Sequence, residues 1–391
     1  MLRRLLELAG FFLKLGTISF GGPAAHLAFM EDEVVRRRRW ISAGRFLDLV
    51  GASNLIPGPN AVEIAGHVGY CRAGLPGSIV AGLGFTIPAV AMTLVLAWSY
   101  GRYGAIPQVE AFLHGVKPAV LAVVFTAVWR LGRKALALWQ LALVGAGVAA
   151  TVLCGADEVV ALLAGSLLGV LLLRLTRPDS GLNVGKPAAV VLGVSAGGSA
   201  RVAHATTLAA VGAGAATPGA ASLWSLGLFF LKVGAVWYGG GYVLLAYLEG
   251  GLVGHYAGFG QKELLDAVAI GQLTPGPMLT CATFAGYLIA GLPGALVATA
   301  AIVLPSFVFV ALTNPLISRL RSSRWASRFL DAVSAASVGL MIAVSITLTL
   351  ATLVDWRAWT VAIVAGAVAV RWRPSPAWLV LGGAVAGRLL W

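Results

Sequence analysis

Two prolines flank a glycine at two places in the chain, and each motif interrupts an apolar segment. The motifs are Pro57-Gly58-Pro59 and Pro275-Gly276-Pro277. Proline breaks a helix because it lacks an N–H group and clashes with the preceding turn. The half-helix that starts after the break has unpaired N–H groups and the positive end of the helix dipole. These features suit the binding of a small tetrahedral oxyanion.

Two further breaks precede these motifs, at Gly21-Gly22-Pro23 and at Gly239-Gly240-Gly241. Glycine lets the backbone approach a ligand closely. Irregular backbone at membrane depth is tolerated only where it is buried in protein or lines a polar cavity. Breaks at matching positions of two related segments therefore indicate a transport site. The alternative is that the breaks only let the helices bend or pack closely.

We predict that the break residues and nearby polar groups form the anion site. Lys14 and Lys232 could neutralise a dianion, or could extend to the membrane surface instead. Asn54 and Gln272 can donate hydrogen bonds, and His26 is either a second cation or a packing residue. The predicted set is Lys14, Gly21, Gly22, Pro23, His26, Asn54, Pro57, Gly58, Pro59, Asn60, Ala61, Lys232, Gly239, Gly240, Gly241, Gln272, Pro275, Gly276, Pro277 and Met278.

Glu63 and His67 are four residues apart and so share one helix face. The corresponding residues of the second half, Cys281 and Ala285, cannot do the same chemistry. A buried carboxyl–imidazole pair could bind a proton, or could be a structural ion pair. The three cysteines match no metal motif, and no nucleophile–base pair, metal cluster or cofactor motif is present. We therefore expect no enzyme activity, metal or cofactor.

The composition indicates an integral membrane protein made of helices. Of the 391 residues, 59% are hydrophobic and 11% are charged, too few charges to cover a water-soluble surface. The net charge of +13 comes from short basic stretches between apolar runs, a pattern typical of cytoplasmic loops rather than of nucleic-acid binding. Apolar segments are predicted near 78–100, 112–129, 136–153, 159–173, 295–313, 329–353, 359–370 and 377–390.

The chain contains an internal duplication. The segment FFLKLG at 11–16 recurs as FFLKVG at 229–234, and the same offset aligns the glycine and proline motifs. We predict a first repeat over residues 1–175 and a second over 223–391, joined by a linker at 176–222.

Loop charges predict that the two repeats are inverted. Arg36 to Arg39 and Arg45 follow the first break, whereas the matching stretch of the second half contains only Lys262. Later in the repeats the bias reverses. Because basic loops stay in the cytoplasm, equivalent loops must lie on opposite sides of the membrane. Inversion also requires either that the stretch 186–222 crosses the membrane once or that one of the apolar segments named above does not cross.

The motifs together resemble the chromate ion transporter family in its long two-domain form. The resemblance rests on FFLKLGTISFGGPAAH, EDEVVRRRRW and NLIPGPNAVEIAGHVGY in the first half, and on FFLKVGAVWYGGGY and GQLTPGPMLTCATFAGY in the second. It implies a multi-pass protein of the inner membrane that exports chromate and confers chromate resistance. Gly241 departs from the pattern of the first half, which has Pro23 there.

Other functions are compatible with the same pattern. A carrier of sulfate or another oxyanion is the main alternative, because sulfate has the charge and shape of chromate. A membrane-embedded enzyme and a purely structural membrane protein are more remote alternatives. The expected partners are an oxyanion and the lipid bilayer, without nucleic acid; the sequence leaves open a homodimer and coupling to protons.

Overall fold

The computed structural model describes residues 1–19, 23–104, 106–176, 222–256, 259–316, 324–372 and 374–391. These residues form helices and connecting turns, with no strand among them. The predicted linker, with its proposed crossing, lies almost wholly outside the described residues, as do Gly21 and Gly22.

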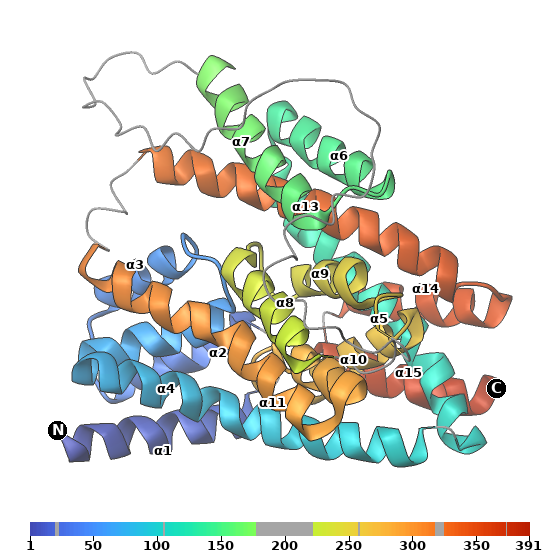
Figure 1. Cartoon of the computed structure of the whole chain (residues 1–391), viewed down its shortest axis with the longest axis horizontal. Coiled ribbons are helices and arrows are strands. Elements are labelled where there is room, and N and C mark those ends of the chain that lie inside the picture. Colours follow the sequence, from blue (N-terminus) through green and yellow to red (C-terminus); the bar gives the residue numbers. More distant parts are fainter. Residues whose placement is uncertain (20–22, 105, 177–221, 257–258, 317–323, 373) are drawn as a thin grey trace.

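The first half begins with two short helices, a π-helical turn and a third short helix before longer helices follow (Figure 1). In order, they are α1 (Leu2–Ile18), α2 (Pro23–Glu31), η1 (Asp32–Arg37), α3 (Ala43–Ser53), α4 (Asn60–Tyr103), α5 (Pro107–Ala135), α6 (Trp139–Leu153) and α7 (Glu158–Thr176).

The second half repeats this order of short and long helices. It consists of α8 (Leu223–Val236), α9 (Val243–Leu252), α10 (Gln261–Leu273), α11 (Thr280–Thr313), η2 (Asn314–Leu316), α13 (Arg324–Thr352), α14 (Trp356–Arg371) and α15 (Pro376–Leu390). The eight apolar segments predicted from the sequence coincide with α4 to α7, α11 and α13 to α15. Five helices among the described residues are long and apolar enough to cross a membrane.

The long helices α4 and α11 each fold back on themselves near one end. The turns lie at Gly74 and Gly291, with φ of +67° and +63°, a region that glycine adopts without strain. In α4, Gly69 packs directly on the backbone of Gly77. A short first segment of α4 therefore returns beside the long second segment, and α11 repeats this fold.

The segment from α2 to the residues after η1 also runs back to α1. Trp40, just after η1, packs edge-on against Phe11 of α1, with ring centroids 5.9 Å apart. In the second half, the Tyr247 hydroxyl of α9 donates to the carbonyl of Val236 in α8 at 3.0 Å. The sequence prediction of interrupted, re-entrant helices is confirmed.

Equivalent helices of the two halves run in opposite directions. Gly82 of α4 packs on Phe307 of α11, whereas Gly101, later in α4, faces Tyr287, which comes earlier in α11. An antiparallel pair of equivalent helices is what inversion of the repeats requires.

The later helices are exchanged between the halves (Figure 1). Helix α5 of the first half packs on α14 and α15 of the second, while α13 of the second half packs on α6 and α7 of the first. Small residues form these contacts: Gly115 lies against Gly383 and Gly387, and Gly169 lies against Ala332. Close approach of small residues is a common basis of helix packing in membranes.

Candidate functional site

Each half has a first break, which follows its first helix, and a second break at its proline-glycine-proline motif. The first break of each half accepts a hydrogen bond from the second break of the other half. The N–H of Gly276 donates to the carbonyl oxygen of Ser19 at 3.0 Å, and the N–H of Gly58 donates to that of Trp237 at 2.8 Å. We call these bonds the first clasp and the second clasp, respectively. Ser19 and Trp237 are equivalent under the duplication, and so are Gly58 and Gly276. The two clasps are therefore related by the same pseudo-symmetry as the halves.

Further contacts connect the two clasps into one junction. Gly241 packs against the side chain of Met278, which joins the two breaks of the second half. The Tyr238 hydroxyl donates to the carbonyl of Leu55 at 3.3 Å. Through these contacts the described parts of all four breaks are linked. Each proline-glycine-proline segment is buried, as irregular backbone within a membrane must be.

Glycine is required at both clasp donors by conformation and by space. Gly58 has φ of +139° and Gly276 has φ of +97°, values at which a side chain is strained. A Cβ atom on Gly58 would overlap the Glu63 carboxyl and the Ser306 hydroxyl, and one on Gly276 would lie 2.7 Å from the Cβ of Ala89. The N–H groups of both glycines serve the clasps, so an anion must use other donors while the clasps are closed.

The remaining donors lie in the first turns of the half-helices. Helix α4 begins at Asn60, directly after Pro59, as predicted. Because the N–H groups of a first turn have no partner inside the helix, those of Asn60 and Ala61 point out of its end. The second half differs from the prediction: α11 begins at Thr280, after a tighter turn in which Cys281 N–H donates to the carbonyl of Met278 at 3.1 Å.

The polar side chains beside the two second breaks are arranged alike. The Asn60 amide donates to Asn54 Oδ1 at 2.9 Å, and the Gln272 amide lies 3.6 Å from the sulfur of Met278. Asn54 is exposed and Gln272 is half-buried, so protein does not completely cover the polar side chains beside either proline-glycine-proline motif. Among the described residues, these are the predicted amide donors that remain accessible.

His26 supports the first clasp. Its buried ring lies edge-on to Phe85, and Nε2 is 3.1 Å from the carbonyl oxygen of Ser19. This oxygen therefore receives two donors. Leu244, the equivalent of His26, is apolar, so the second clasp has no matching imidazole.

The two predicted lysines have different surroundings. Lys14 is exposed on α1. Lys232 is 3.3 Å from Asp157, which precedes α7. Burial opposes ionisation of Asp157, but the N–H groups of Val160 and Val159 and the Lys232 ammonium together hold its pKa below the usual range. Lys232 is thus already paired with a carboxylate, whereas Lys14 has no such ion pair among the described residues.

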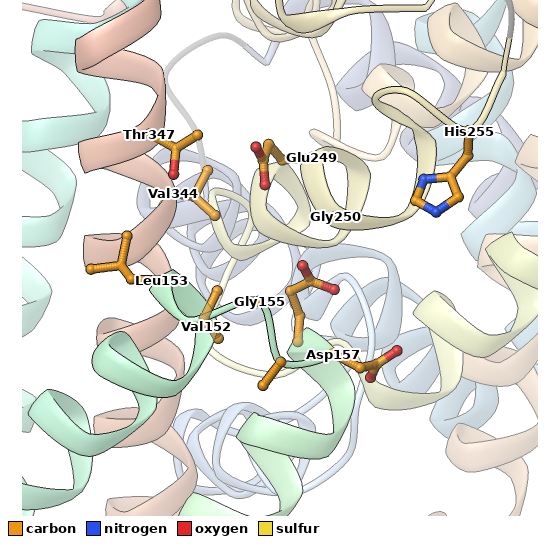
Figure 2. A pocket seen from close by; sticks show the side chains of 11 residues that line it. Val152, Leu153, Gly155, Asp157, Glu249, Gly250, His255, Val344 and Thr347 are labelled. Carbon is orange, nitrogen blue, oxygen red and sulfur yellow. The ribbon is translucent and has the colours of Figure 1, made fainter. Parts of the chain in front are cut away.

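A pocket of about 450 Å³ lies next to this ion pair (Figure 2). Asp157, Glu158 and Glu249 line it, together with His255 and Thr347. Its lining includes none of the break residues, and its carboxylates repel an anion. No group of side chains suited to a metal ion occurs in the part of the chain that the structure describes.

Glu63 and His67 lie on the first segment of α4, and both are fully buried. Ser53 donates its hydroxyl to Glu63 Oε2 at 3.2 Å. The other carboxyl oxygen, Oε1, lies with the Ser306 hydroxyl against Gly58. The sequence did not single out Ser53, Ser306, Ser19 or Trp237. For Ser19 and Trp237 no side-chain signal exists, because the carbonyl groups form the contact.

Comparisons with known proteins agree on one family. The family model described as "Chromate transporter" matches residues 6–170 and again 224–388. The chain is 32% identical to a chromate transport protein of Cupriavidus metallidurans over 98% of this chain and 92% of that protein. It is 30% identical to a probable chromate transport protein of Synechococcus elongatus, over 99% and 96% of the two chains. An uncharacterized transporter of Methanocaldococcus jannaschii is 25% identical over 88% and 84%. No solved structure matches the chain.

Proposed function

Because this chain belongs to the chromate transporter family, we propose that it exports chromate from the cytoplasm through the junction of the four breaks. The observation that carries the proposal is the pair of clasps, which brings broken backbone from both inverted halves together. Such a junction between inverted repeats is a common place for a substrate site in transporters.

The proposed site binds a dianion mainly through backbone and amide donors. These are the first-turn N–H groups of α4 at Asn60 and Ala61 and the side chains of Asn54 and Gln272. The helix dipole adds about half a positive charge at that end. Lys14, which precedes the first break on α1, supplies a full charge in this proposal, while Lys232 is held by Asp157. Donors of this kind recognise charge and tetrahedral shape, and so distinguish chromate from sulfate only modestly.

The membrane potential supplies the driving force for export in this proposal. Moving one charge across an inside-negative membrane is worth about 2.3 kcal/mol per 100 mV, so a dianion gains roughly 4.6 kcal/mol. That energy supports a concentration ratio on the order of a thousandfold. Coupling to a proton is therefore allowed but not required, and export in the inner membrane would confer resistance to chromate.

Uptake of chromate into everted membrane vesicles tests this function. Uptake should rise with an imposed potential, positive inside the vesicle, and should fall in the Asn54→Ala variant. The matched control is Thr17→Ala, an exposed position on α1 outside the proposed donor set. Transport of sulfate without chromate would favour the general oxyanion carrier. Transport of neither ion, with protein present in the membrane, would refute the proposed function.

A further inference from the structure

Glu63 is a buried carboxyl group without a cation. It is 0% exposed, and no described residue forms a salt bridge with it. Ser53 donates to Oε2, and the uncharged Ser306 hydroxyl lies beside Oε1. An ionised carboxylate buried in this way costs several kcal/mol unless it is paired. The arrangement seen here therefore fits the protonated, neutral acid.

The carboxyl oxygen Oε1 of Glu63 lies against Gly58, whose N–H group is the donor of the second clasp. Oε1 occupies the space beside Gly58 in which a side chain would lie. The N–H of Gly58 is at the same time bound to the carbonyl of Trp237. A carboxylate accepts hydrogen bonds about twice as strongly as a neutral oxygen. Loss of the proton from Glu63 would therefore make it a competitor for the Gly58 N–H group.

The first clasp lacks this neighbour. Cys281 stands in place of Glu63, and the space beside Gly276 faces Ala89 and the backbone of α1. Among the described residues, a titratable group thus lies against the donor of the second clasp alone, whereas His26, the titratable neighbour of the first clasp, lies at the acceptor, the carbonyl oxygen of Ser19.

His67 lies one turn beyond Glu63 on α4. Like Glu63, it is buried. The side chain of Asn314 is next to it, and the charge of Arg45 in α3 acts on it. Around Glu63 itself, α11 contributes Ser306, which is uncharged, and the α8–α9 break contributes Tyr238.

We propose that Glu63 is a proton switch for the second clasp. In the protonated form Gly58 donates to Trp237 and the two halves are held together. When Glu63 loses its proton, its carboxylate takes the Gly58 N–H group and Trp237 is released. The inference deepens the proposed function, because it makes the opening of one clasp depend on pH and leaves the other unaffected.

Hydrogen exchange of the glycine amides tests the switch without any substrate. Pro57 and Pro59 have no N–H groups, so Gly58 carries the one backbone N–H group of its motif. Gly276 does so in the equivalent motif of the second half. After correction for the intrinsic effect of pH, protection of Gly58 should fall about tenfold or more as pH rises through the titration of Glu63. Gly276 in the same molecule should show no such change.

Two variants separate the switch from a structural effect. Glu63→Gln keeps the shape of the neutral acid and should leave Gly58 protected at every pH. Glu63→Cys introduces the residue type of the equivalent position, Cys281, and should make the Gly58 and Gly276 amides behave alike. Equal pH dependence of Gly58 and Gly276 in the wild type, or unchanged pH dependence in Glu63→Gln, would overturn the switch. These measurements contain no chromate, so an overturned switch would leave the transport proposal standing. Conversely, a failure of chromate transport in vesicles would not change the exchange rate of the Gly58 amide.

Discussion

Gly58 and Trp237 come from opposite halves of the chain, and the N–H of one donates to the carbonyl oxygen of the other at 2.8 Å. The bond joins two breaks that enter the junction from opposite directions, since the halves are inverted. A change that opens one side of the junction therefore acts on backbone belonging to both halves.

Gly58→Ala should abolish transport. The substituted Cβ would overlap Glu63 and Ser306, and φ of +139° is strained for alanine, at a cost of about 1–3 kcal/mol. Gly51→Ala in α3 is the matched control, because a Cβ there meets no atom within 4 Å. Chromate uptake into vesicles, normalised to the protein inserted, distinguishes the two. Equal uptake by both variants would show that the second clasp is not needed for transport.

His26→Leu, which copies Leu244 of the mirror half, should loosen the first clasp. The carbonyl oxygen of Ser19 would lose one of its two donors, and a single hydrogen bond is worth about 0.5–1.5 kcal/mol. The Gly276 amide should therefore exchange a few-fold to about tenfold faster. If chromate affinity falls while the exchange rate stays the same, His26 contacts the anion instead of the clasp.

Tyr100→Phe should destabilise the contact between the halves. The Tyr100 hydroxyl of α4 donates to the buried carboxyl of Asp266 in α10 at 2.7 Å. Leaving a buried polar group without its partner costs about 1–3 kcal/mol. Thermal unfolding in detergent should show the loss, with Tyr103→Phe, an exposed position, as control. In a double-mutant cycle with Asp266→Asn, strictly additive effects would mean that the hydrogen bond contributes nothing.

The Lys232–Asp157 ion pair should make stability depend on acid pH. The folded-state pKa of Asp157 lies below its usual value. Its contribution is therefore present above the unfolded-state pKa and is lost as the pH falls through the folded-state pKa. Solvent screens both partners, so the effect is small. Unfolding midpoints measured against pH should converge at low pH for the wild type and Asp157→Asn. Lys14→Ala should not change the pH dependence, and a change would mean that Lys14 also interacts with a titrating group.

The architecture could be predicted largely from local signals. Glycine and proline act on their own backbone, so the breaks and their matching positions in the two halves were visible in the sequence. Loop charges likewise predicted the inversion. These features depend on residues close to one another in the chain.

The partners across the junction could not be predicted in this way. Gly58 and Trp237 meet through main-chain groups, which every sequence provides, so no residue type marks the contact. Asp157 lies far along the chain from Lys232, and the duplication offers no guide because Lys14 has no equivalent carboxylate partner. The proximity of Glu63 to Gly58 depends on the bend of the break, which the residue types do not fix.

The exchange of helices between the halves has a consequence for biosynthesis. Helix α5 belongs to the first repeat, but α14 and α15, which pack on it, are made after the earlier helices of the second repeat. The first repeat therefore cannot complete its packing before the second repeat is made, and until then α5 must remain in lipid or with insertion factors. A chain cut between the repeats should yield two fragments that are unstable alone and recover their packing when made together.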